Sequence, residues 1–447
     1  MANLLKAGYA VVDITPPMGI NISGYYKERL AEGVLDNINA VGVALAVNDT
    51  KVLVITIDNC GIKQSILNDF RAYVSERTGV PVDAIYIHVT HTHTGPRVWE
   101  TAEGLELSYR ESLKLKVADV AILALNDLKP AKMGIGQSEA KNISFVRRFR
   151  MKDGSVKTNP GVDNPDILAP IGDVDERVNV IRFAREDAKD IVMINFADHP
   201  DTVGGNLISG DWPTLTRNLM AKATDVNCVL LNGAQGDVNH VNVHPKGGDL
   251  NGMFMDFDDV SRGYAHANHM AKVVVGATMQ VMDKVEYKDV DSIKFVKRTV
   301  KIPANKAKTA EELKEAHRIN ELYLAGRDHE LPYEGMMLTT VVAEAGRMVE
   351  LENAPDEFER DFYAFSIGKV AFVGIPGEPF TGIGRGIKDT EGFDMISVTC
   401  LTNGSEGYYP MKDAYAEGGY EARTSRFKEG VAELIIEEGK KMLNDLK

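Results

Sequence analysis

Histidine, carboxylate and tyrosine side chains stand just beyond the ends of several apolar segments of this chain. AIYIHV runs into THTHTGP at residues 90–96, IVMINF into ADHP at 197–200, CVLL into NGAQGDVN at 232–239, VAFVG into IPGEP at 375–379, and ISVTCL into TNG at 402–404. Ligands of α/β proteins bind outside the carboxyl ends of the strands. If these five segments are strands of one sheet, their loops meet at one site.

The side chains in these loops are of the types that bind zinc. Neutral imidazole nitrogens and carboxylate oxygens are common zinc ligands, and the loops carry His91, His93, His199 and Glu378. His91 and His93 are two residues apart at a strand end, and side chains with that spacing point to the same side of an extended chain. A catalytic zinc lowers the pKa of its bound water to about 7. The pattern therefore predicts a hydrolase that uses a metal-bound hydroxide and needs no activated serine.

Other polar side chains show weaker signals. Arg147 and Arg148 lie in a short basic cluster that suits an anionic substrate group or a salt bridge, and His240 directly follows the 232–239 loop, at the expected mouth of the site. Asp58 and Asp211 each have two interpretations. Either carboxylate orients a ligating histidine, or it caps a loop or helix.

The elements that position these loops alternate between apolar runs and helical periods. We expect strands at 41–47, 52–57, 84–89, 178–183, 190–196, 228–231, 369–374 and 395–401. We expect helices at 64–77, 108–127, 213–223, 260–284, 308–326, 335–354 and 424–445. The fold class is therefore predicted to be α/β, with a mixed β-sheet core flanked by helices and the active site at the carboxyl ends of strands.

A single domain is expected over residues 1–447, with 286–355 as an insertion or lobe. Within that segment, 286–303 has the pattern of exposed strands, and Thr309 with Glu312 forms a capping-box pattern before a helix. Residues 140–175 and 240–258 show no clear period. We expect these two irregular stretches to form the wall of the pocket, because long excursions from a compact fold are usually functional.

The composition excludes several functional classes. The net charge of 447 residues is −14, and no basic stripe is present of the kind that a nucleic-acid binder needs. No apolar run approaches the roughly 20 residues of a membrane helix, and the first residues lack the apolar core of a secretory signal. The three cysteines are far apart, which favours free thiols in a reducing compartment. We expect a cytoplasmic protein that acts on a small molecule, without a nucleic-acid or membrane partner.

The ordered motifs resemble the catalytic domain of the neutral/alkaline, non-lysosomal ceramidases. The matching stretches span nearly the whole chain: AGYAVVDITPPMGINISGY, TIDN, HVTHTHTGP, ADHP, ISGDWP, NGAQGDVN, GIPGEPFT and NGSEGYYPMKDAYAEGGYE. The resemblance implies Zn²⁺ as cofactor. Its implied ligands are His91, His199, Glu378 and a tyrosine, placed at Tyr408 with Tyr409 and Tyr415 as alternatives. His93 is implied to face the metal-bound water or the substrate carbonyl, as a transition-state partner or proton shuttle.

Two departures from the family pattern shape the expected reaction. Where the ceramidases have a serine after Gly-Asp-Val, this chain has Asn239, which excludes a serine nucleophile there and leaves an amide that can bind an oxyanion. Asp237 of the same loop is included among the catalytic residues. The lipid-cleaving ceramidases carry a C-terminal β-sandwich domain and are usually secreted, whereas this chain is expected to be a short bacterial-type homologue without that domain.

We therefore expect hydrolysis of a small soluble amide, ester or lactone, with Tyr408 and His93 stabilising the oxyanion. One alternative is a ceramidase that acts on N-acyl sphingosine. Another is a non-catalytic module that binds carbohydrate or lipid. A two-metal phosphatase, with Arg147 or Arg148 as phosphate clamp, is disfavoured because too few aspartates accompany the histidines.

Overall fold

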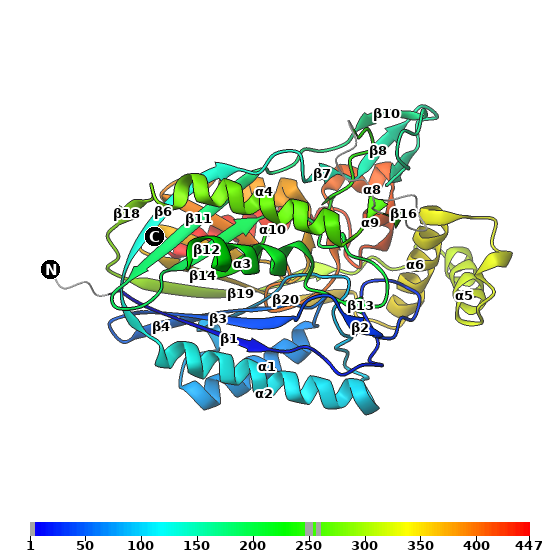
Figure 1. Cartoon of the computed structure of the whole chain (residues 1–447). Coiled ribbons are helices and arrows are strands. Elements are labelled where there is room, and N and C mark those ends of the chain that lie inside the picture. The colour runs from blue at the N-terminus through cyan, green and yellow to red at the C-terminus, as the bar shows by residue number, and fades with distance from the viewer. Residues whose placement is uncertain (1–4, 246–253, 256–260) are drawn as a thin grey trace.

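Two β-sheets lie at the centre of the molecule (Figure 1). The computed structural model describes residues 5–245, 254–255 and 261–447. The larger sheet follows the order β14-β12-β11-β6-β1-β3-β4-β5, with β18 paired to β6 beside that path. Its strands are β1 (Leu5–Asp13), β3 (Asn39–Val47), β4 (Thr50–Ile57), β5 (Ile85–Val89), β6 (Lys129–Glu139), β11 (Arg177–Arg185), β12 (Ile191–Phe196), β14 (Asn227–Asn232) and β18 (Glu286–Lys288). The sheet is mixed, because β4/β5 and β12/β14 are parallel while its other pairs are antiparallel.

The smaller sheet has the order β19-β20-β21-β23. Its strands are β19 (Ile293–Pro303), β20 (Glu357–Ile367), β21 (Val370–Gly374) and β23 (Met395–Thr399). The sheets face each other. Asn179 on β11 and Asn195 on β12 donate side-chain hydrogen bonds to the carbonyls of Ile396 and Val398 on β23. The largest apolar cluster contains side chains from both sheets, so the core lies between them.

Helices cover the outer faces (Figure 1). α1 (Gln64–Thr78) packs on α2 (Gly104–Asn126), which lies across β1 and β3. α3 (Asp211–Thr224) and α4 (Tyr264–Met282) cover the β14 and β6 side, and α7 (Thr381–Lys388) and α10 (Val431–Asp445) cover the smaller sheet. The predicted fold class is confirmed: a mixed sheet core is flanked by helices. Among the described residues, no helix combines the length and the apolarity needed to cross a membrane.

The hairpin between β3 and β4 shows how the sequence forms these strands. Val47 pairs with Thr50 across a two-residue turn, and Asn48 takes the left-handed φ of 52° that such hairpin turns require. Both strands are almost entirely buried. They read as continuous apolar runs because both faces of this part of the sheet are covered.

The segment 286–355 combines strands of the main sheets with a pair of helices. β18 joins the larger sheet, and β19 pairs with β20 from Ile293 to Pro303. α5 (Ala310–Leu324) and α6 (Gly335–Leu351) pack on each other around their own apolar cluster. Thr309 accepts the N–H of Glu312 at 3.1 Å, as the capping-box pattern predicted. The division of the chain into one domain with a lobe stays a prediction.

Two expected elements differ from the structure. The last helix was expected from residue 424, but α9 (Tyr420–Thr424) ends there and α10 begins at Val431. Between them Phe427 is buried and bridges to Ala304 beside β19, so this stretch extends the smaller sheet instead of forming a helix. Residues 140–175, expected to be irregular, contain a three-stranded sheet of β10 (Ile167–Pro170), β8 (Arg148–Met151) and β9 (Val156–Thr158). Most of the expected 240–258 wall lies outside the described residues.

Candidate active site

The loops that follow the parallel strands meet at one edge of the two sheets. β4 and β5 are parallel, and so are β12 and β14, and β21 and β23. His88 on β5 links three of these strand ends. Its Nδ1 lies 2.8 Å from the carbonyl of Cys400, and its Nε2 accepts the N–H of Asn232 at 2.9 Å. The ends of both sheets are thereby joined directly behind the site.

Three imidazole rings converge at this edge. The Nε2 atoms are 3.1 Å apart between His91 and His199, 3.2 Å between His199 and His93, and 3.3 Å between His93 and His91. An Nε2 atom carries either one proton or one lone pair, so three that face one another cannot all be satisfied by mutual hydrogen bonds. Nitrogen ligands on a tetrahedral zinc lie about 3.3 Å apart, because Zn–N bonds are about 2.0 to 2.1 Å. The triangle therefore has the dimensions of a zinc site.

Glu378 adds a carboxylate to the three rings. Its Oε2 lies 3.2 Å from Nε2 of His91 and 4.0 Å from Nε2 of His199. That oxygen is buried and receives no hydrogen bond of acceptable geometry. One ligand atom each from His91, His199 and Glu378 lie within 4.8 Å of one another, close enough to hold a single cation. A buried carboxylate oxygen without a donor is expensive in a protein interior, and a bound Zn²⁺ would satisfy it.

His91 reaches this cluster through an unusual backbone conformation. Its φ is 78°, in the left-handed region that non-glycine residues seldom adopt. The chain therefore turns after β5 instead of continuing as a strand, and strand alternation is not what brings His91 and His93 together. The carbonyl of Cys60 accepts the Nδ1–H of His91. That bond leaves the lone pair of Nε2 facing the cluster.

His93 is held by the loop around residue 200 and by a loop near the N-terminus. Its N–H donates to the carbonyl of Pro200 at 3.1 Å, and its own carbonyl accepts a bond from Arg29 at 2.7 Å. Its Nδ1 lies 3.4 Å from Oδ1 of Asp201, which accepts a bond from the hydroxyl of Tyr25 at 2.8 Å. Sequence reasoning missed Asp201 and Tyr25, although Asp201 lies two residues after His199.

Tyr408 is joined to Glu378 through the backbone. The two-residue strands β22 (Glu378–Pro379) and β24 (Tyr408–Tyr409) are parallel, and Glu378 is opposite Tyr408. The two tyrosines named as alternatives make hydrogen bonds away from the imidazole cluster. Tyr409 is buried, stacks on Phe427 and donates to the carbonyl of Pro376, and Tyr415 donates to the carbonyl of Phe427. Of the three tyrosines named from the sequence, Tyr408 is the one that faces the cavity beside His199.

Arg147 lies between Tyr408 and His199. Its guanidinium carbon is 5.4 Å from the centre of the Tyr408 ring, and its Nη1 is 3.4 Å from Nδ1 of His199. The guanidinium is buried and bonds Oε1 of Glu421 at 2.7 Å and the carbonyl of Gly236 at 2.8 Å. The charge of Arg147 is thus paired with Glu421, while its guanidinium lies against Tyr408 and His199.

Burial and the neighbouring charges set the protonation states. Burial, Arg147 and the other two imidazoles lower the pKa of His199 well below its usual value. Burial, then the charge of Glu378, raises the pKa of Tyr408. His199 is therefore neutral, as a metal ligand must be, and Tyr408 keeps its phenolic proton near neutral pH.

A cavity of about 740 Å³ opens above the cluster, within the usual range for small-molecule sites. His93, His199, Arg147 and Tyr408 face it. Its walls come from residues 24–29, from Thr158 and Asn159, from Tyr420, and from the α5–α6 helix pair with the segment that joins the two helices. The pair and that segment contribute Tyr323, Asp328, Gly335, Met336, Leu338, Thr339 and Val342. The expected wall at 140–175 is thus only one side. Residues 24–29 and the helix pair were not expected to line the site.

Asp237 and Asn239 do not line this cavity. Asp237 accepts the backbone N–H of Thr381 at 2.7 Å and the Thr381 hydroxyl at 3.2 Å, so it holds the start of α7. The amide of Asn239 donates to Asn159 at 2.9 Å and accepts the N–H of Val241 at 3.0 Å. The geometry therefore supports positioning roles for both residues and gives no support to the predicted catalytic ones.

Arg148 and His240 are also absent from the cavity lining. Arg148 bonds Glu417 at 3.2 Å and the carbonyl of Gly418 at 3.1 Å, which is the salt-bridge alternative of the sequence analysis. His240 is buried against the ring of His266, with ring centres 4.9 Å apart. Their predicted contacts with substrate have no geometric support.

The two aspartates with open interpretations both stabilise loops. Asp58 is buried, pairs with Arg217 and accepts the hydroxyl of Thr214 at 2.8 Å. Oδ2 of Asp211 accepts the N–H groups of Thr202 and Val203 at 2.9 Å and 2.8 Å. Asp211 therefore fixes the loop that carries His199, through the backbone and not through the imidazole.

Comparison with solved structures identifies the architecture. The structure superposes on the neutral ceramidase from Pseudomonas aeruginosa with a TM-score of 0.74 and 15% identity, covering 99% of this chain and 74% of that one. A second match, a ceramidase complexed with C2, has a TM-score of 0.71 and 14% identity, covering 99% of this chain and 75% of that one. The chain has the fold of the neutral ceramidases. No family model matches the sequence, and no curated protein sequence matches it. The fold that the motifs implied is confirmed.

Proposed function

We propose that the protein is a zinc-dependent hydrolase, ceramidase-like in mechanism, that cleaves a carbonyl compound such as an amide, ester or lactone. One observation carries the proposal: the three Nε2 atoms and the donor-less oxygen of Glu378 converge beside a cavity. Zn²⁺ in such a site supplies a Lewis acid and lowers the pKa of bound water. The fold shared with ceramidases also supports the proposal of a hydrolase.

The residues of the chain then have separable tasks. His91, His199 and Glu378 hold the ion, with Tyr408 as the further ligand or as donor to the oxyanion. His93, which faces the cavity, is placed to bond the substrate carbonyl or to pass a proton to the leaving group. Asp201 beside Nδ1 of His93 orients that ring, and Arg147 fixes the positions of Tyr408 and His199.

The lining of the cavity combines polar groups with a larger apolar part. Lys27, Glu28 and Asp328 contribute charged groups, and Tyr25, Tyr26, Tyr323 and Tyr420 contribute hydroxyls. These polar groups suit a small soluble amide, ester or lactone. The ceramidase alternative rests on a different part of the wall. Met336, Leu338 and Val342 of α6 form an apolar strip that an acyl chain could occupy.

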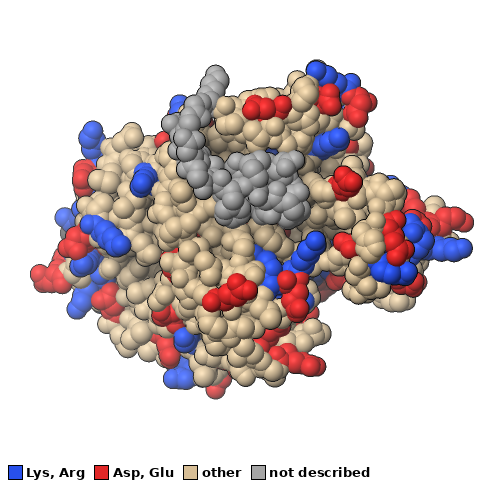
Figure 2. All heavy atoms as spheres, turned by 45° about the vertical axis from the view of Figure 1, so that its right-hand side comes forward, with Lys and Arg blue, Asp and Glu red and all other residues tan. Residues whose placement is uncertain are grey.

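A non-catalytic binding module and a phosphatase are less well supported. A binding module has no use for three converging imidazoles, and the guanidinium that was to clamp phosphate is paired with Glu421. On the face drawn in Figure 2, the described Lys and Arg side chains are interspersed with Asp and Glu. That mixed surface gives no support to a nucleic-acid partner. The location in the cytoplasm stays a prediction.

The test measures metal content and hydrolysis on the same preparation. We expect about one zinc per chain, loss of hydrolysis on chelation, and recovery when zinc is restored. The substrates are soluble N-acetyl amines, lactones, and N-acyl sphingosines of increasing acyl length. Activity on the short soluble compounds alone supports the proposal, and activity that rises with acyl length supports the ceramidase alternative. Full hydrolysis by metal-free protein would refute both.

A further inference from the structure

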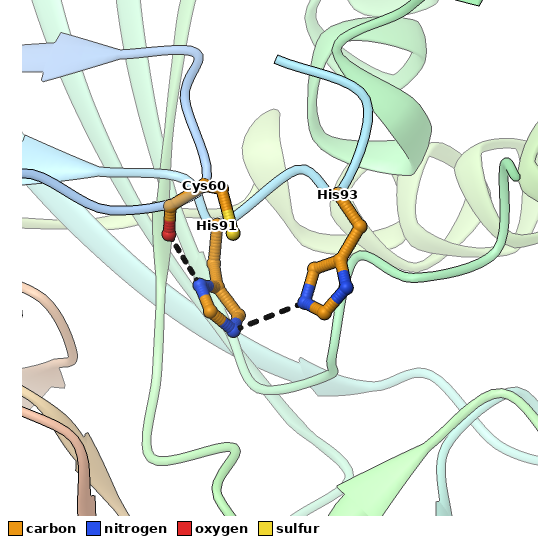
Figure 3. A group of neighbouring side chains, drawn as sticks. All are labelled: Cys60, His91 and His93. Atoms are coloured by element: carbon orange, nitrogen blue, oxygen red, sulfur yellow. Dashed lines mark hydrogen bonds between the residues drawn. The ribbon is translucent and has the colours of Figure 1, made fainter. Parts of the chain in front are cut away.

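A thiol lies beside the imidazole cluster (Figure 3). Cys60 belongs to the loop that follows β4. Its Sγ and one ring nitrogen each of His91 and His93 all lie within 4.8 Å of one another, the geometry of a group that can hold a cation. All three cysteines are free, but Cys228 is buried in β14 and Cys400 is buried just after β23. Of the described thiols, Cys60 is the one that joins such a group.

We propose that the thiol of Cys60 is a ligand of the bound cation, beside His91, and that it makes the site selective for thiophilic ions. The proposal rests on the proposed metal-dependent function. It adds a fourth residue type that the ligand set of two histidines, a glutamate and a tyrosine does not contain. Binding replaces the thiol proton by the metal, and that proton leaves to solvent.

The distances permit this coordination with small adjustments. Sulfur and nitrogen ligands on one tetrahedral zinc lie about 3.5 Å apart, since Zn–S is about 2.3 Å and Zn–N about 2.0 Å. The upper limit of 4.8 Å within the group exceeds that separation by about 1.3 Å, so the thiol has only a short distance to move. The ring nitrogens of His91 and His199 already have the spacing that a zinc needs, and Cys60 adds a sulfur beside them.

His91 limits the cluster to one ion. Its Nδ1 is bonded to the carbonyl of Cys60, so Nε2 is the one nitrogen that it has left for a metal. The group with His199 and Glu378 and the group with Cys60 and His93 share that residue. A single cation therefore has a carboxylate on one side and a sulfur on the other. Hard ions prefer the carboxylate and soft ions prefer the thiolate.

Cys60 also allows a clean experiment, because its two contributions use different atoms. The backbone carbonyl orients His91, whereas the proposed ligand is the side chain. Asn59 holds the loop independently of the thiol. Its side chain donates to the carbonyl of Pro96 at 2.8 Å and accepts the N–H of Gly61 at 3.2 Å. Cys60→Ala therefore removes the sulfur and keeps the bond that positions His91.

The test uses the full chain loaded with cadmium alone. We expect an ultraviolet sulfur-to-cadmium charge-transfer band in the wild type, its loss in Cys60→Ala, and its retention in the matched control Cys228→Ala. We also expect the ratio of Cd²⁺ to Mn²⁺ affinity, measured by competition dialysis, to fall at least tenfold in Cys60→Ala only.

The outcomes separate this proposal from the proposed function. Wild-type protein that binds one cadmium without the sulfur band overturns the role of Cys60 and leaves the metal-dependent hydrolase intact. A band that persists in Cys60→Ala has the same meaning. Wild-type protein that binds neither zinc nor cadmium overturns both. If Cys60→Ala does not fold, zinc protection of Cys60 from alkylation in the wild type, read by peptide mass spectrometry, decides the question, because unchanged alkylation refutes coordination.

Discussion

The base of the candidate site and its outer wall are built in opposite ways. The base consists of strand-end loops that are buried and tied by backbone bonds, such as those of His88 to Cys400 and Asn232. The wall is made by residues 24–29 and by the α5–α6 pair, and the tips of these segments are exposed. The base fixes which chemistry is possible, and the wall determines which molecule reaches it. A change in the base should therefore affect every substrate, whereas a change in the wall should affect some.

The largest effect is expected at the base, in His91→Ala. Removing one of the three converging nitrogens should lower kcat/KM at least about 1000-fold, or about 4 kcal/mol, together with the zinc content. Metal analysis and initial rates check this on several substrates. The control His317→Ala changes a half-exposed histidine on α5 and should leave both unchanged. Equal zinc content in His91→Ala and wild type would contradict the assignment.

The buried ion pair behind Arg147 gives the next largest effect. Glu421 is fully buried and bonds Arg147 at 2.7 Å and Thr158 at 2.8 Å. Glu421→Gln leaves a buried guanidinium without its counter-charge, which should cost about 3 kcal/mol or more of unfolding free energy. Urea denaturation measures it. Glu417→Gln, which breaks more exposed pairs with Arg148 and Arg150, should cost less than about 1 kcal/mol.

The pH dependence of stability tests the hydrogen bonds by which His88 connects the ends of the two sheets. Burial lowers the pKa of His88 to about 4, against about 6.5 in an unfolded chain. The unfolded state therefore binds a proton first as the pH falls. The contribution of His88 to the free energy of unfolding is therefore fully present above about pH 6.5. It falls by about 3 kcal/mol between about pH 6.5 and 4, and it does not change further at lower pH. Denaturation of His88→Gln across this range should show a shallower slope, and a slope equal to wild type would contradict the prediction.

The smallest effect is expected in the wall, in Met336→Ala. Loss of its apolar contact should raise KM for substrates with long acyl groups up to about tenfold, or about 1.4 kcal/mol, with kcat and zinc content unchanged. Steady-state kinetics on a short and a long N-acyl substrate measure the difference. Leu324→Ala, an exposed change on α5, is the control. An equal rise of KM on the short and the long substrate would contradict the prediction. It would mean that Met336 affects every substrate, as residues of the base do.

The base could be predicted from the sequence because its signals are local. An apolar strand followed at once by His91, His199 or Glu378 places each side chain at a sheet edge, and parallel pairing brings the edges together. The same reasoning does not separate catalytic from positioning roles at Asn239 and Asp237, because a polar loop at a strand end can equally serve to fix neighbouring backbone. Their residue types were informative, but their partners could not be known.

The wall could not be predicted, because its segments come from distant parts of the chain and carry no chemical motif. Tyr26 and Tyr323 lie 297 residues apart, yet the hydroxyl of Tyr323 donates to the carbonyl of Tyr26. β6 escaped prediction for a different reason. A Cβ added at its Gly134 would lie 2.5 Å from Cγ2 of Val285, so the glycine is needed for close packing. Glycine inside a strand weakens the local signal for a strand.

The short ladder between β22 and β24 has a consequence for tracing relatives of this protein. The N–H of Glu378 donates to the carbonyl of Gly407, and the N–H of Phe380 donates to that of Tyr409. These bonds hold the carboxylate of Glu378 opposite the phenol of Tyr408, and they do so whatever the length of chain between the two strands. Insertions between the two strands can therefore accumulate without disturbing the pair. A search for distant homologues should therefore use the dipeptides Glu378–Pro379 and Tyr408–Tyr409 and their pairing. The number of residues between them can vary from one homologue to the next.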